Sequence, residues 1–134
     1  MTQALYPAFK ASLMRGEVDM ESDFIRVLLI DPTEYTYDPA HIFLDEVPSA
    51  AVIDICTLTS KAVSADGVFD SDDPLFEGVG VGTNIDAIIM YLHTGTDATS
   101  PLIHYKDEGL TGVPMTGDGG DIELIVDEDG WFGL

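Results

Sequence analysis

Basic residues are scarce in this sequence. Five lysines and arginines stand against 25 aspartates and glutamates, which gives a formal net charge of −20. Duplex binding depends on lysine and arginine replacing the counterions of phosphates, so this charge excludes nucleic acid as a partner. It also disfavours anionic membrane surfaces. The same charge keeps the protein in solution and destabilises it through self-repulsion, which salt relieves.

Cysteine is rare, and long hydrophobic runs are missing. The single Cys56 excludes an intrachain disulfide, and without basic neighbours to activate the thiol we expect it to be a small core residue. The longest apolar runs, such as 87–92, are far shorter than the ~20 residues of a membrane-spanning helix. The opening residues MTQALYPAFK lack the charged and apolar regions of a secretory signal. We therefore expect synthesis in a cytoplasm and no membrane partner.

Hydrophobic residues nevertheless make up 46% of the 134 residues, which is enough for the core of one domain. We expect a single domain over residues 1–134, with a helix in residues 1–16 followed by a β-sandwich over residues 24–134. Leu5, Phe9 and Leu13 recur at helical spacing, and Gly16 is placed to stop the helix.

Short apolar segments alternate with turn signals after the helix. Asp66-Gly67 marks a tight turn, and Phe69 and Phe76 beyond it are expected to point into the core. About seven or eight short strands, with no strand–helix–strand alternation, predict a mainly β fold of the sandwich or jelly-roll kind. Segment 85–92 is the most hydrophobic, so we expect it at the centre, with Ile88 and Ile89 both buried. The other expected strands include 24–30, 52–59, 101–106 and 121–126.

No motif typical of catalysis or cofactor binding stands in the chain. The glycines at 78, 80 and 82 lack the spacing of a dinucleotide-binding loop, and no serine stands in a nucleophile elbow. His41, His93 and His104 show no metal-binding spacing, although His93 and His104 would form a pair if their strands brought them together. We expect a protein that is not an enzyme and that carries no cofactor.

Acidic clusters are the remaining candidates for a site. Ca²⁺ takes six to eight oxygen ligands, so a Ca²⁺-dependent module that binds a carbohydrate or another ligand is one possible function. Aspartate is also favoured in turns, and neither cluster has the twelve-residue loop of a helix-flanked calcium site, so solvated turns are the other interpretation. One cluster comprises Asp66, Asp70, Asp72 and Asp73; the other comprises Asp118, Asp121, Asp127, Glu128 and Asp129.

Several segments of the chain follow one another in an order that a known family shares. They are Gly16-Glu17-Val18-Asp19, Phe24-Ile25-Arg26-Val27-Leu28-Leu29-Ile30-Asp31, Tyr35-Thr36, Gly67-Val68-Phe69-Asp70 with Asp72-Asp73, Thr99-Ser100-Pro101-Leu102-Ile103, and Gly119-Gly120-Asp121-Ile122. In this order they resemble a family of small virion proteins of tailed bacteriophages. Members begin with a short helix, a G-D-I-D-like turn and a strand of the I-K-V-A-L-V-D type. They continue with a G-V-F-D-A-D-D-like segment and end with a G-G-D-I strand.

The resemblance covers nearly the whole chain and implies a structural role. Among virion proteins of this size and β content, the role that it favours is capsid cement, also called decoration. The expected partners are the major capsid protein and further copies of this chain, as a homodimer or trimer. The expected location is the outer capsid surface of the virion, where a charge of −20 is better placed than against packed DNA. A structural adaptor of the tail or neck is the alternative within the same class.

Overall fold

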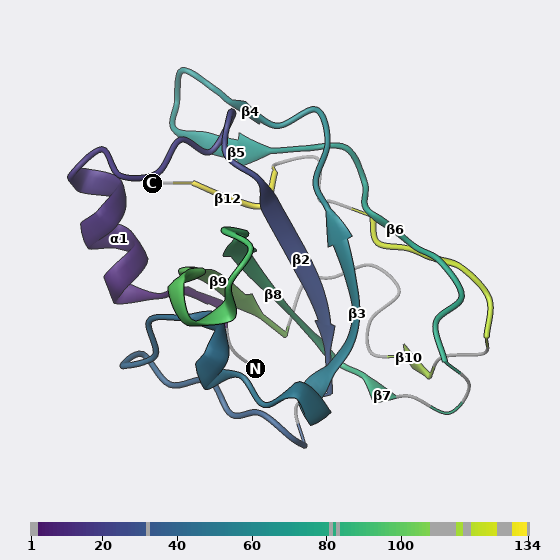
Figure 1. Cartoon of the computed structure of the whole chain (residues 1–134). Coiled ribbons are helices and arrows are strands. Elements are labelled where there is room, and N and C mark those ends of the chain that lie inside the picture. The colour runs from purple at the N-terminus through teal and green to yellow at the C-terminus, as the bar shows by residue number, and fades with distance from the viewer. Residues whose placement is uncertain are drawn as a thin grey trace.

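The chain is organised around one five-stranded antiparallel sheet (Figure 1). A computed structural model describes residues 3–31, 33–80, 82, 84–107, 115–116, 119–125 and 130–133. The sheet runs in the order β1-β9-β8-β2-β3, so β8 lies at its centre. That position confirms the prediction made from its hydrophobic sequence. The five strands are β1 (Gln3–Leu5), β2 (Ile25–Ile30), β3 (Val52–Thr57), β8 (Ala87–Leu92) and β9 (Leu102–Lys106).

Both faces of this sheet are buried at its centre, because structure covers it on two sides. In β2 and β8, Leu28 pairs with Ile89 and Val27 pairs with Met90, so side chains of successive residues enter opposite faces. We call the side of Leu28 and Ile89 the front face, since it is turned to the viewer in Figure 1, and the side of Val27 and Met90 the back face. Ile88 and Ile89 are both fully buried, as expected.

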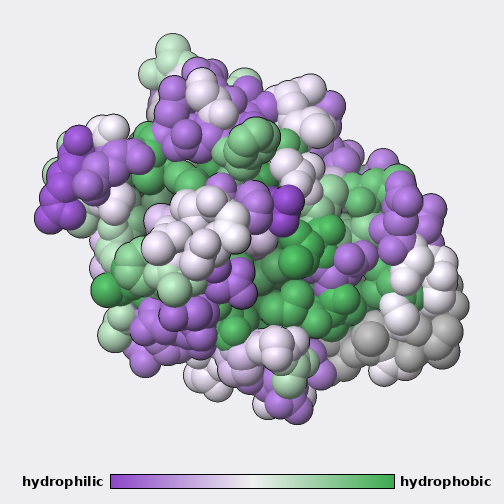
Figure 2. All heavy atoms as spheres, in the orientation of Figure 1, coloured by the Kyte–Doolittle hydropathy of each residue, from purple (hydrophilic) through white to green (hydrophobic). Residues whose placement is uncertain are grey.

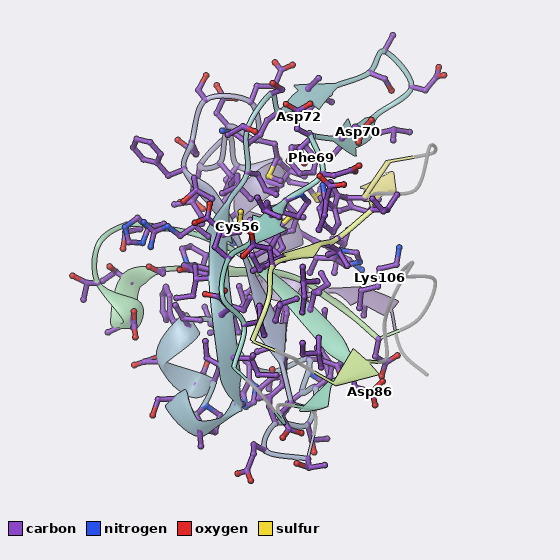
Figure 3. All side chains as sticks on the ribbon, turned by 90° about the vertical axis from the view of Figure 1, so that its right-hand side faces the viewer. Cys56, Phe69, Asp70, Asp72, Asp86 and Lys106 are labelled. Atoms are coloured by element: carbon purple, nitrogen blue, oxygen red, sulfur yellow. The ribbon has the colours of Figure 1, made fainter. Side chains whose placement is uncertain are left out.

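Three short antiparallel ribbons form the layer behind the back face (Figure 3). The expected turn at Asp66-Gly67 joins two of their strands, and Gly67 adopts a φ of +80° there. Phe69 and Phe76 are buried, as their spacing predicted. The ribbons are β4 (Ala62–Val63) with β5 (Val68–Asp70) and β12 (Phe132–Gly133), β6 (Leu75–Phe76) with β11 (Ile122–Glu123), and β7 (Asn84–Ile85) with β10 (Met115–Thr116).

The connection between β2 and β3 covers part of the front face. It contains two single-turn 3-10 helices, η1 (Leu44–Glu46) and η2 (Ser49–Ala51), and a third, η3 (Asp97–Thr99), lies beside η1. Backbone hydrogen bonds fasten the connection to the start of β9, from Leu44 N to Ser100 O at 2.9 Å and from Leu102 N to Ile42 O at 2.9 Å. The front face is therefore covered at one end and open at the other.

The first residues differ from the prediction of a helix over 1–16. Residues 3–5 form β1, which pairs with β9, and helix α1 spans only Pro7–Met14. Tyr6 N donates to Ile103 O at 3.0 Å, so pairing with a buried strand outweighs the helical spacing of Leu5. Pro7 suits the first helical position because its missing N–H would have no partner there. Gly16, with a φ of +76°, ends the helix as expected.

The fold class is thus confirmed as mainly β, with antiparallel strands and one short helix near the N-terminus. Buried side chains from the sheet, the ribbons, the connection and α1 form one contiguous core. Among the described residues, no helix is both long and apolar enough to cross a membrane.

A candidate docking groove on the front face

The structure does not gather the four candidate calcium ligands of the first acidic cluster. Asp70 and Asp72 lie at one end of the molecule (Figure 3), and the Asp70 carboxylate accepts a hydrogen bond from Ser71 N at 2.8 Å. Asp66, Asp72 and Asp73 are exposed around two turns. Across the described ranges, no three His, Cys, Asp or Glu side chains are placed to hold a metal ion.

The second acidic cluster lies mostly outside the described residues. This applies to Asp118, Asp127, Glu128 and Asp129. Asp121 is described, and its Oδ1 accepts a hydrogen bond from Gly78 N at 2.9 Å. Its carboxylate therefore fixes the corner that joins two ribbons of the back layer.

The three histidines occupy separate environments. His93 lies at the front face, whereas His104 pairs with Met90 and points to the back face, so the two do not form the pair considered above. His41 Nδ1 hydrogen-bonds the Tyr35 hydroxyl at 3.0 Å. In the part of the chain that is described, no histidine hydrogen-bonds a serine, threonine or cysteine side chain. Cys56, expected in the core, is only half-buried, and burial raises the pKa of its thiol.

A groove of about 360 Å³ opens on the front face between the sheet and the connection. Its floor includes the buried side chains of Leu28 and Tyr91. Figure 2 shows apolar side chains gathered in this region, over β2 and β3, with hydrophilic groups around them. The volume falls within the range of ligand-binding and side-chain-binding pockets. The lining residues are Arg26, Leu28, Leu44, Val47, Ser49, Val52, Ile55, Tyr91, His93 and Asp97.

Arg26 is the cationic group of this groove. Its Nε donates to Thr57 Oγ1 at 3.1 Å, which orients the guanidinium across β2 and β3. Among the described residues the only ion pair is His41 with Asp38, at 3.8 Å, so Arg26 has no carboxylate within ion-pair distance there. The sequence contained a signal for this site, because Arg26 is the one charged residue within an otherwise apolar strand.

One exposed apolar side chain lies beside the groove, and another lines it. Phe24 directly precedes β2 and is 68% exposed, and Ile55 on β3 is 44% exposed. Phe24 O accepts a hydrogen bond at 2.8 Å from the N–H of His93, whose side chain lines the groove. Phe24 and Ile55 thus add exposed apolar side chains to a groove of mixed apolar and polar lining, and exposed apolar side chains gathered on one face are typical of a protein-binding site.

A cluster of tyrosines holds the connection in place at the other end of the front face. The Tyr6 and Tyr35 hydroxyls hydrogen-bond at 2.7 Å, and the ring of Tyr37 packs on Tyr6 and Tyr105, with centroids 5.1 Å and 5.4 Å away. Burial raises the pKa of Tyr6, and burial beside Asp107 raises the pKa of Tyr105 to about 12. These neutral phenols build one wall of the front layer. The spacing of the tyrosines in the sequence did not indicate this cluster.

A second, smaller cavity of about 270 Å³ lies at the back face, beside β1 and β12. Its one ionisable lining residue among the described ones is His104, which is 1% exposed and packs edge-on against Phe132 with centroids 5.2 Å apart. The Nδ1 atom of His104 has no hydrogen-bond partner among the described residues. Burial, with a smaller effect from Lys106, lowers the pKa of His104 to about 3, so the ring is neutral at physiological pH.

Two comparisons of the sequence with known proteins found no relative of this chain. No protein-family model matches the chain, and no curated protein is detectably similar to it in sequence.

Proposed function

We propose that this chain is a non-catalytic structural protein that acts by binding other proteins. The observation that carries the proposal is the front-face groove, which the exposed Ile55 lines and beside which Phe24 is exposed. The groove stands on a sheet that is buried on both faces at its centre, so its walls are held rigidly. Rigid walls suit binding because little conformational freedom is lost when a partner docks.

We further propose that the protein is a capsid cement protein on the outer surface of a tailed-phage virion, where it contacts the major capsid protein. The support is the ordered set of segments that resembles small virion proteins. In the structure these segments form the core strand β2 together with turns and strand starts: Gly67 closes the turn that leads into β5, and Gly119 N donates to Val79 O at 2.8 Å. The resemblance therefore concerns residues that shape the fold.

The charge supports the outer position. With a formal charge of −20, the protein is repelled by packed DNA and compatible with a solvent-facing shell. A cement protein bridges neighbouring subunits, so it needs contact surfaces on more than one side. Met14 on α1, 88% exposed, offers an apolar contact on an element separate from the groove.

The copy number of the protein in purified particles tests this proposal. Quantitative mass spectrometry should find it in numbers approaching those of the major capsid protein, and particles assembled without it should lose heat resistance that the added protein restores. Detection in only a handful of copies would contradict the cement role and favour an adaptor of the tail or neck. Absence from the particles would contradict a virion role altogether.

A further inference from the structure

Phe24 is the more exposed of the two apolar side chains at the front-face groove. Side chains alternate along a strand, so Phe24 projects to the same side as Arg26 and Leu28, which both line the groove. At 68% exposure its ring remains largely in water. It does not line the groove of its own chain. The front face therefore carries an exposed apolar side chain next to a groove whose floor includes Leu28 and Tyr91.

This arrangement meets the requirement of a two-fold symmetric contact. In such an interface the same patch serves both copies, so each projection must find its hollow on an identical surface. The hydrogen bond from His93 N to Phe24 O places the projection beside a residue that lines the groove. A two-fold axis through this patch would bring the Phe24 ring of each copy to the groove of the other.

The charges that line the groove are compatible with self-association. Two chains of charge −20 repel each other, so self-association requires a contact with few carboxylates. The groove contains one carboxylate, Asp97, and one guanidinium, Arg26, which lacks a carboxylate within ion-pair distance among the described residues.

The residue beside the projection supplies a matching charge. Asp23 directly precedes Phe24, so a Phe24 ring entering the groove of a second copy would bring Asp23 toward that copy's Arg26. The Asp23 carboxylate already accepts a hydrogen bond from Asp19 N at 2.8 Å through Oδ2, which fixes its position. Arginine binds carboxylates strongly when the pair is shielded from water.

We propose that the front faces of two copies pack around a two-fold axis, with Phe24 of each copy in the groove of the other and Asp23 against Arg26. This inference rests on the proposed function only in treating the front face as a protein-docking surface, and it names the occupant as a second copy of the chain.

Sedimentation velocity of the purified full chain over a range of concentrations tests the inference. The dimer fraction should rise with concentration, and it should rise further between about 0.05 M and about 0.5 M NaCl because salt screens the repulsion between the two chains. Phe24→Ser should weaken dimerisation about tenfold or more, as loss of an aromatic anchor does. Met14→Ser removes an exposed apolar side chain from α1 and should leave dimerisation unchanged. Thermal melts check that each variant is folded.

A charge exchange tests the contact between Asp23 and Arg26. Arg26→Asp should weaken the dimer, and the double variant Asp23→Arg with Arg26→Asp should restore much of the affinity. A chain that stays monomeric at every concentration and salt, or a dimer that ignores Phe24→Ser, overturns the inference. A monomer that is nevertheless abundant in virions overturns this inference alone, whereas a Phe24-dependent dimer absent from virions overturns the cement role alone.

Discussion

The hydroxyl oxygens of Tyr6 and Tyr35 lie 2.7 Å apart, in a buried hydrogen bond between the chain start and the connection on the front face. The Tyr35 hydroxyl continues to His41 Nδ1 at 3.0 Å. This short network joins residues distant in sequence, and it holds in place the segment that forms one wall of the groove.

Tyr35→Phe should therefore destabilise the protein. The substitution leaves the fully buried Tyr6 hydroxyl without this partner, which should lower the free energy of unfolding by about 1–3 kcal/mol. Tyr37→Phe is the matched control, because its hydroxyl hydrogen-bonds no described residue, and it should cost less than about 0.5 kcal/mol. Urea melts measure both. Equal losses in the two variants would show that the network contributes nothing specific.

Acid should destabilise the protein through His104. Its pKa in the folded protein is lowered to about 3, whereas the unfolded chain binds a proton there below about pH 6.5. Unfolding then takes up a proton, so the stability that the neutral ring provides is present above about pH 6.5 and is lost as the pH falls toward about 3.

His104→Leu tests this effect because it removes the titrating group and keeps the site apolar. Relative to His104→Leu, the original protein should lose up to about 1.4 kcal/mol per pH unit between about pH 6 and about pH 4. Comparing the two proteins cancels the effect of the carboxylates that they share. Parallel pH profiles for the original protein and His104→Leu would refute a buried neutral histidine.

Ile89→Ala should cost about 2–5 kcal/mol of unfolding free energy, because it leaves a cavity at the centre of the sheet, where Ile89 is fully buried between β2 and β9. Ile42→Ala, at a position 44% exposed, should change stability by less than about 0.5 kcal/mol. Denaturant melts of the two variants compare them directly. A negligible loss for Ile89→Ala would mean that β8 is not the central strand.

Gly130→Ala should strongly destabilise the folded protein. Gly130 has a φ of +87°, and a Cβ there would lie 2.7 Å from both Phe69 O and Val68 Cγ1. Gly16→Ala is the control, since Gly16 has a φ of +76° and nothing within 4 Å of the added atom. The control should cost about 1–2 kcal/mol for the left-handed backbone alone. The crowding at Gly130 should add about 1–3 kcal/mol. Similar melting temperatures for the two variants would contradict the close packing of Gly130 on β5.

Local patterns predicted the long strands, since the apolar pattern of a strand is carried by residues close together in the chain. The apolar runs of 24–30 and 52–59 became β2 and β3 with small differences at their ends, and 87–92 became β8, whereas Ile85 belongs to β7 in a separate ribbon. The prediction of a helix over residues 1–16 was partly wrong, because Leu5 has helical spacing but lies in β1. Pairing of β1 with β9, nearly a hundred residues away, decides that conformation, and such pairing leaves no periodic trace near Leu5.

The sequence by itself determined the mainly β class, the turn at Asp66-Gly67, the central place of the 85–92 segment and a surface of strong negative charge. These follow from periodicity, turn chemistry and composition, which act locally or as sums. Only the tertiary structure decided that Arg26, Val47, Ile55 and His93 line one groove, that His104 is buried and neutral, and that His93 and His104 lie on opposite faces. These features depend on which distant segments pack together, and that packing is set by how apolar side chains from the whole chain are buried in one core.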